Sequence, residues 1–412
     1  MFLAAFWRNL SDERRVQLQR PNLLGPSTMN TEGKPSTGQV RLYDALGSLP
    51  PAYEPLFAAS AGFSFFHSLP WYRNFTKTVL AHSECTRIFA LESPERQPIA
   101  ALLMRYDASR SWLTTRILSP MSNYYSSLFG IQAEVQGDQM QAALESLAKG
   151  IAADRPRWDI VNLRPLAADT PAFEGMARAL SNAGMMVQTY FCFGNWYLRV
   201  GGRSFAEYSN ALPSQLRNTL RRKKEQLRKA GNSRIVVYRG LEGLDEGLLA
   251  YERIYASSWK VPEPYPEFVR GLCRIGAENG WLRLGVAYIG EEPAAAQIWI
   301  VCDGIANIYK LAYDERFAKL SLGSLLTAQL MELAIDEDKV KEIDYLTGDD
   351  PYKRDWMSDR RERWGIMAFN RRTPRGLLAA ARHFGARRVK KALARWRSSH
   401  SPAVPAAERE RA

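Results

Sequence analysis

The sequence contains few of the residues from which most metal sites and disulfide frameworks are built. It holds four cysteines and four histidines in 412 residues, and no two cysteines form a CxxC pair. This spacing predicts neither a zinc site nor a disulfide framework. The shortage of histidine also leaves a Ser-His-Asp triad poorly supplied. We therefore expect no metal ion in this protein.

Long apolar runs and glycine-rich nucleotide motifs are also missing. No run approaches the ~20 apolar residues that cross a bilayer, and residues 1–7 are too short for a signal peptide. There is no Walker loop, no GxGxxG and no HExxH. These absences argue against a kinase or a dehydrogenase, and they predict a cytoplasmic protein.

The composition is that of a globular chain with a local excess of positive charge. With 46% hydrophobic and 24% charged residues, the chain can bury the cores of two domains. The positive residues behind the net charge of +13 are concentrated in two segments, 217–229 and 371–397. The second of these segments holds ten Lys/Arg and no acidic residue. Both clusters suit an anionic partner, and a solvated helix face explains either of them as well.

The pattern of apolar residues predicts the same order of elements twice. Each half has three strands, a helix, a strand, a helix and a last strand. In the first half these are expected at 87–93, 98–107, 112–119, 138–153, 158–166, 171–183 and 187–200. In the second half they are expected at 282–290, 293–302, 305–313, 325–335, 340–348, 352–357 and 363–370.

The remaining segments complete the predicted organisation. Two further helices are expected between the halves, at 214–230 and 248–259. The chain then divides into a flexible leader, an N-terminal domain, a C-terminal domain, a basic amphipathic helix and a disordered tail, at 1–40, 41–200, 203–370, 374–397 and 398–412. The basic helix has the composition of one that lies on an anionic membrane, or of one that packs on the protein with its charges in water.

One segment of the second half carries a recognisable series of motifs. In order, they are Tyr313-Asp314, Ser321-Leu-Gly323, Asp344, Gly348-Asp349, Tyr352-Lys353 and Trp356. The series resembles the GNAT superfamily, in the branch of the CelD-like and FemAB-like acyltransferases. The resemblance implies an α/β fold of two tandem GNAT-like domains, each a mixed, mainly antiparallel sheet flanked by helices. It also implies an N- or O-acyltransferase whose chemistry lies in the second half.

The resemblance places the acyl donor at the start of a helix. Free amides at a helix N-terminus suit a pyrophosphate, and the residues expected to bind the donor are Arg316, Lys319, Ser321, Gly323 and Ser324. Acetyl-CoA or another acyl-CoA is the expected donor. The chain departs from the glycine-rich GNAT loop by carrying Leu320 and Leu322. An acyl carrier protein or an aminoacyl-tRNA, as in the FemAB-like relatives, therefore stays open as donor.

Acyl transfer requires a base and stabilisation of an oxyanion. The residues expected to supply them are Asp344, Lys353, Tyr352 and Asp314. Residues expected to bind the acceptor are Tyr124, Tyr125, Trp259, Asp349 and Trp356. Structural roles are the alternative: a turn or cap for Asp314, a hydrogen bond within a strand for Asp344, and core packing for Tyr352 and Trp356. Strand alternation favours an exposed Lys310, although a cation in a cleft is the other interpretation.

The leading hypothesis is transfer of an acyl group to an amine or hydroxyl acceptor, a small molecule or a sugar bound between the halves. By resemblance, the acceptor is a precursor of the cell envelope or of an exopolysaccharide, and the protein is expected to contact the inner face of the membrane. One alternative is an aminoacyl-tRNA-dependent transferase, the one case in which we expect a nucleic-acid partner. An alternative of another class is a non-catalytic module that binds an anionic polymer or membrane through its basic helices.

Overall fold

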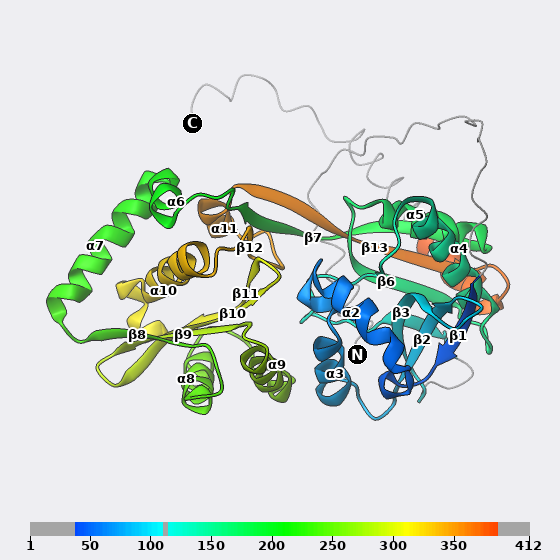
Figure 1. Ribbon diagram of the computed structural model, residues 1–412, viewed down its shortest axis with the longest axis horizontal. Helices are drawn as coiled ribbons and strands as arrows, with labels where there is room; N and C mark the ends of the chain where they lie inside the picture. Colours follow the sequence, from blue (N-terminus) through cyan, green and yellow to red (C-terminus); the bar gives the residue numbers. More distant parts are fainter. Residues whose placement is uncertain (1–37, 110–113, 386–412) are drawn as a thin grey trace, which may run out of the picture. The chain divides into compact units, whose positions relative to one another are not determined.

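The computed structural model describes residues 38–109 and 114–385. The predicted disordered tail, all but three residues of the predicted leader and the basic helix beyond residue 385 lie outside this part of the chain. Within it, the order of elements that we predicted occurs in both halves (Figure 1). Because apolar periodicity is a local property of the sequence, it identified these elements before their partners were known.

The first half follows the predicted order. Its elements are β2 (Glu84–Glu92), β3 (Pro98–Asp107), β4 (Ile117–Pro120), α4 (Gly137–Ala153), β6 (Ile160–Ala167), α5 (Pro171–Asn182) and β7 (Met185–Arg199). Helices α4 and α5 bury their apolar faces against one side of this sheet, in a core with Leu144, Leu147 and Leu180 at its centre. Two elements not foreseen are α2 (Glu54–Ala61) and α3 (Leu69–Thr78). They cover the other side of β2 and β3.

The second half repeats the predicted order. Its elements are α7 (Ser214–Ala230), α8 (Leu244–Ala256), β9 (Leu282–Ile289), β10 (Glu292–Cys302), β11 (Ile305–Tyr313), α10 (Leu322–Glu332), β12 (Glu342–Asp344), α11 (Pro351–Trp356) and β13 (Asp359–Asn370). The second half also has three elements that we did not predict, α6 (Phe205–Ala211), β8 (Ser233–Tyr238) and α9 (Pro266–Glu278). In the first half, β1 (Gln39–Tyr43) was not predicted either. Strand β1 begins inside the segment that was expected to be a leader.

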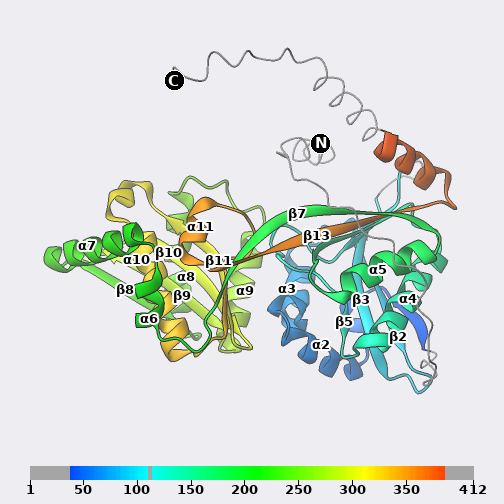
Figure 2. The same ribbon diagram turned by 90° about the horizontal axis from the view of Figure 1, so that it is seen from above.

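The two halves share one sheet through an exchange of their last strands. The sheet order is β1-β2-β3-β4-β6-β13-β7-β12-β11-β10-β9-β8. Strand β13 of the second half therefore lies between β6 and β7 of the first, while β7 pairs with β12 of the second. Figure 2 shows β7 and β13 side by side where they run between the two halves. Both strands are long enough to continue from one half into the other. Residues 359–370, which were predicted to belong to the second domain, thus pair with two strands of the first half.

Each half has one parallel strand pair that separates after a short contact. Strands β11 and β12 pair over three residues on each strand, from Ile305 and Glu342 onward, although β11 continues to Tyr313. Strands β4 and β6 pair over two residues on each strand. Beyond these contacts the backbone amides and carbonyls of the two strands no longer form hydrogen bonds with each other.

Helices from the two halves also pack on each other. Helix α3 contacts α9, and the Asn74 side-chain amide donates to the Phe268 carbonyl at 2.9 Å. Trp71 stacks edge-on against Phe268, with ring centroids 5.0 Å apart. The largest apolar cluster accordingly contains residues of both halves. The halves are therefore joined by their core as well as by their sheet.

The helical turns at residues 374–385 lie against the exchanged strand β13. The Phe384 ring packs on Phe369, with centroids 5.7 Å apart, and His383 Nε2 lies 2.7 Å from Gln188 Oε1. Leu377 and Leu378 are exposed. Within the described residues, no helix is long and apolar enough to span a bilayer. Contact of the basic helix with a membrane stays a prediction.

Candidate functional site

The predicted donor loop connects the end of β11 to helix α10. After Tyr313, the Asp314 side chain caps a short 3₁₀ helix by accepting from the Arg316 amide at 2.9 Å. Ser321 then adopts a left-handed conformation with φ of 55°, and α10 starts at the next residue. The first amides of a helix lack partners within that helix. The amides of Leu322 and Gly323 thus stand at the positive end of α10.

Asp314 is held in place by an ion pair. Its carboxylate lies 2.8 Å from Arg316 Nη2, and it is 3% exposed. The hydrogen bonds from Arg316 lower the pKa of Asp314, although burial opposes this shift. A carboxylate with a lowered pKa is a weak base, so the structure favours the capping role that was the alternative interpretation. Arg316 also pairs with Glu292 at 3.1 Å.

Gly323 faces open space at the start of α10. A Cβ added there would meet only Tyr313 Cδ1, at the ordinary contact distance of 3.8 Å. The carbonyl of Gly323 accepts from Gln297 Nε2 at 3.0 Å and from Thr327 Oγ1 at 2.9 Å. The position of this backbone is therefore fixed by buried side chains while its outer side stays clear.

Asp344 belongs to a buried network between β12, β7 and β13. Its oxygens accept from Asn195 Nδ2 at 2.5 Å, from Arg361 Nη2 at 2.5 Å and from the Leu346 amide at 2.6 Å. Arg361 also lies 4.2 Å from the centroid of the Tyr197 ring. These contacts connect the second half to the exchanged strands, so the geometry supports the structural alternative for Asp344.

Lys353 is buried beneath the loop that follows β12. Its Nζ donates to the Thr347 carbonyl at 2.6 Å and pairs with Asp350 at 3.1 Å. Burial lowers the pKa of Lys353, and the partner Asp350 opposes this shift. Tyr352 points outward and is 45% exposed, edge-on to Tyr345. The adjacent pair Tyr352-Lys353 thus separates into one exposed phenol and one buried cation.

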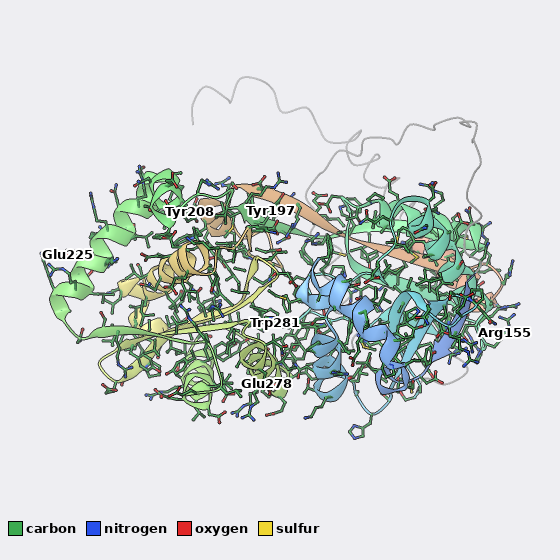
Figure 3. The ribbon with its side chains drawn as sticks, viewed as in Figure 1. Arg155, Tyr197, Tyr208, Glu225, Glu278 and Trp281 are labelled. Atoms are coloured by element: carbon green, nitrogen blue, oxygen red, sulfur yellow. The ribbon has the colours of Figure 1, made fainter. Side chains whose placement is uncertain are left out.

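The other two predictions in this segment lie in packing contacts. Asp349 accepts from Trp196 Nε1 at 2.9 Å and pairs with Arg360 at 2.6 Å. Trp356 is 5% exposed in the core of the second half. Its carbonyl accepts from the hydroxyl of Tyr208 at 2.7 Å, and Tyr208 reaches α11 from α6 (Figure 3). Neither residue lines the cavity described next.

A cavity of about 470 Å³ lies where the loop between α8 and α9 meets β11 and the first half. It is lined by Tyr124, Tyr255, Trp259, Lys260, Val261, Pro262, Glu263, Pro264 and Lys310. Two of the predicted acceptor-binding residues, Tyr124 and Trp259, thus line one cavity although 135 positions separate them. Tyr125 packs behind it, with its ring 4.3 Å from that of Tyr124.

A half-buried ion pair forms the floor of the cavity. Lys310 Nζ lies 2.5 Å from Glu263 Oε1, with side-chain exposures of 16% and 9%. The Tyr125 hydroxyl donates to the other Glu263 oxygen at 2.6 Å. Burial lowers the pKa of Lys310, against the opposing effect of Glu263. The expectation of an exposed Lys310 is therefore wrong, because the loop between α8 and α9 folds over its strand.

Lys260 is a second cation at the same cavity. Its Nζ lies 5.6 Å from the Trp259 ring centroid and 5.8 Å from that of Tyr255. Burial, followed by repulsion from Lys310, lowers the pKa of Lys260 to about 8. Sequence reasoning missed Lys260 and Glu263. Both lie in a Pro-rich stretch, and no local pattern marks a loop that will lie over a strand.

This lowered pKa predicts how stability depends on pH. The folded state binds the proton of Lys260 less tightly than the unfolded chain, so the charged side chain destabilises the fold below pH 8. The penalty shrinks between the folded value and the unfolded value of about 10.4. We expect Lys260→Met to raise the melting temperature at pH 7 and to leave it unchanged near pH 10.5. Equal shifts in melting temperature at pH 7 and near pH 10.5 would contradict this prediction.

The comparisons with known proteins agree with this geometry. Residues 214–354 match the family model described as an acetyltransferase (GNAT) domain. The matched region is thus similar to GNAT acetyltransferase domains. It contains the predicted donor loop, strands β11 and β12 and all the cavity-lining residues except Tyr124. Among the curated proteins, none matches the sequence.

Two solved structures have a similar fold. A crystal structure of FemX superposes with a TM-score of 0.57 and 10% identity, over 78% of this chain and 96% of that one. A conserved protein of unknown function from Bacteroides thetaiotaomicron VPI-5482 superposes with a TM-score of 0.50 and 9% identity, over 81% and 100%. The similarity extends across both halves and concerns the fold alone. Within the described residues, no group of three His, Cys, Asp or Glu side chains could hold a metal ion.

Proposed function

We propose that the protein transfers an acyl group from a pantetheine thioester, with acyl-CoA as the simplest donor, to an amine or hydroxyl acceptor in the cavity. One observation carries the proposal. The Trp259 ring at the cavity packs on Tyr313 at 4.6 Å, and Tyr313 is also the nearest neighbour of the open face of Gly323. The cavity and the predicted donor loop thus lie next to each other at the C-terminal end of β11.

The donor's phosphates would lie at the start of α10. Its unpaired amides and helix dipole attract a pyrophosphate, and Lys319 adds positive charge in the preceding turn. The pantetheine arm would follow β11 where β12 leaves it, since an extended amide chain can bond to the backbone groups of parted strands. The thioester would then reach the level of Lys310.

The acceptor would occupy the cavity. Exposed aromatic faces at Tyr124 and Trp259 suit the apolar face of a sugar ring, and the charged floor suits polar substituents. The nucleophile then attacks the thioester carbonyl, and the oxyanion that forms needs nearby donors. The Tyr124 hydroxyl is one candidate, because it lines the cavity and a phenol is protonated at neutral pH and can donate a hydrogen bond.

The donor site predicts an effect of replacing Gly323 by valine. The added side chain has room beside Tyr313, so the fold should persist. It would nevertheless cover the backbone that the donor approaches. We expect CoA to bind at least ~10-fold more weakly, about 1.4 kcal/mol, in a calorimetric titration with an unchanged melting temperature. Gln226→Ala, on the exposed part of α7, is the control; an unchanged affinity in Gly323→Val would place the donor elsewhere.

An aminoacyl-tRNA donor is the second candidate, and one surface favours it. Helix α7 carries seven Lys/Arg and one Glu, and Lys223 Nζ donates to the Lys319 carbonyl in the donor loop at 2.6 Å. A second cavity, of about 540 Å³, lies along this helix beside Arg221 and Arg222. Basic surfaces of this kind bind phosphate chains with a strong dependence on salt. Salt-sensitive binding of total tRNA, lost in Arg221→Ala/Arg222→Ala, together with no binding of CoA, would favour this donor.

The proposed function is tested by a transfer assay on the full chain. Acetyl-CoA is supplied with glucosamine, glycinamide or glycerol as acceptor, and released thiol and acetylated product are measured together. We expect product from at least one acceptor. Thiol release with no product would indicate hydrolysis, and neither signal from acetyl-CoA would contradict acetyl-CoA as the donor. A non-catalytic module that binds anionic polymer or membrane gives neither signal with any donor.

A further inference from the structure

Three lysines surround the place where donor and acceptor would meet, and two of them already have partners. Lys310 is paired with Glu263. Lys353 is held by the Thr347 carbonyl and by Asp350. Lys260 makes no ion pair with any residue that the structure describes, and its Nζ lies beside the rings of the cavity wall. It is therefore the amine that is available to a bound molecule.

The surroundings of Lys260 oppose a permanent charge on it. Two cations act on it, from β11 and from α11, together with a carboxylate of its own loop and another at the start of α11. These groups are Lys310, Lys353, Glu263 and Asp350. Glu263 is already shared between Lys310 and Tyr125. The aromatic rings of Trp259 and Tyr255 replace water around the ammonium group without supplying a counter-charge.

We propose that Lys260 accepts the proton of the attacking group, and that the acceptor is a weakly basic primary amine such as an α-amino group or the amine of an amino sugar. This inference rests on the proposed function and adds to it the proton acceptor and the class of acceptor. An arginine in this place could not serve, because guanidinium does not lose its proton in proteins.

The reaction balances as follows. The neutral amine of Lys260 takes one proton from the acceptor's ammonium group and becomes an ammonium ion. The free amine nitrogen attacks the thioester carbonyl, a C–N bond forms, and the carbonyl electrons move to oxygen. When the tetrahedral intermediate collapses, the C–S bond breaks and the thiolate leaves. The second nitrogen proton neutralises the thiolate, while Lys260 releases its own proton to water.

This proton transfer requires that the pKa of Lys260 be similar to the pKa of the acceptor's ammonium group. The pKa of Lys260 is lowered to about 8, and α-amino groups have pKa values of about 7.7–8.0. An alkyl amine with a pKa of about 10.4 would give up its proton to Lys260 only about once in several hundred encounters. Weakly basic amines are therefore the class that this lysine can activate.

The titration of Lys260 is tested without any acceptor. The full chain is labelled briefly with acetic anhydride at a series of pH values, and peptide mass spectrometry gives the extent of labelling at each lysine. We expect labelling of Lys260 to rise with a midpoint near pH 8. The matched control is Lys149, which is exposed on α4. The same midpoint at both positions would overturn the proposal, whatever the protein catalyses.

The catalytic role is tested with acetyl-CoA and two amines, glycinamide and Nα-acetyllysine amide. The wild type should prefer glycinamide, with kcat rising as pH passes about 8. Lys260→Arg and Lys260→Ala should lower kcat by ~10²-fold or more while CoA still binds. A tertiary amine, which cannot itself be acylated, should restore part of the activity of Lys260→Ala. Lys149→Ala should behave as the wild type.

The outcomes separate this inference from the function beneath it. Transfer with unchanged kcat in both Lys260 variants would overturn the role of Lys260 and leave the acyltransferase standing. Preference for Nα-acetyllysine amide would overturn the proposed class of acceptor. Absence of transfer to either amine in the wild type would overturn the inference together with acetylation of amines by this protein.

Discussion

A chain that ends at residue 358, just before β13, is expected to fold in neither half. Strand β13 pairs with both β6 and β7, and its Ile366 and Ala368 are fully buried in the core of the first half. Its removal also takes away Arg361, the partner of Asp344 in the second half. A domain's net stability is only about 5–15 kcal/mol. The free energy of the interactions lost with a central strand is larger than this, so neither half should stay folded.

The measurement compares two truncations by circular dichroism and amide hydrogen exchange. The chain ending at 385 keeps every strand that the structure describes and should give a cooperative thermal transition. The chain ending at 358 should show no cooperative transition and no slowly exchanging amides. Residues 203–370 expressed alone should behave in the same way, since β7 is missing from between β12 and β13. A protected core in either short chain would mean that the halves are independent domains.

Lys310→Met is expected to cost the fold about 3–5 kcal/mol and to abolish transfer. The change leaves the Glu263 carboxylate half-buried with only neutral hydrogen-bond donors, and breaking one side of a buried pair typically costs this much. Because the hydrogen bonds of Lys310 and Tyr125 hold the pKa of Glu263 below its ordinary value despite burial, this stabilisation is present above the unfolded pKa and is lost as pH falls through the folded pKa. The variant's deficit in unfolding free energy should therefore shrink in acid.

A double variant separates the pair from the packing around it. Lys310→Met with Glu263→Gln removes both charges, and it should recover most of the stability lost in the single variant but none of the activity. Chemical denaturation of the wild type and of both variants, at pH 7 and at pH 4, gives the six free energies that are needed. If the single and double variants were equally unstable, the loss would come from packing rather than from an uncompensated charge.

The sequence predicted the elements better than the site. Helices α4 and α7 match their predicted ranges to within one residue at either end, because amphipathic periodicity depends on neighbours along the chain. The motif series located the GNAT domain for a related reason, because residue types at fixed spacings can be recognised along the chain without knowledge of the fold. It could not assign roles, because Asp344, Asp349 and Lys353 are bound by groups that no spacing reveals.

The sequence by itself determined the order of the seven elements that recur in each half, and it carried the GNAT resemblance that predicts a donor loop at the start of α10. The tertiary structure alone decided that β7 and β13 exchange places and that Lys260, Glu263 and Lys310 share a cavity with Tyr124. The physical reason is separation along the chain. Local patterns reflect steric preferences and burial within one element, whereas an ion pair such as Lys310–Glu263 forms only after a loop has closed over a strand.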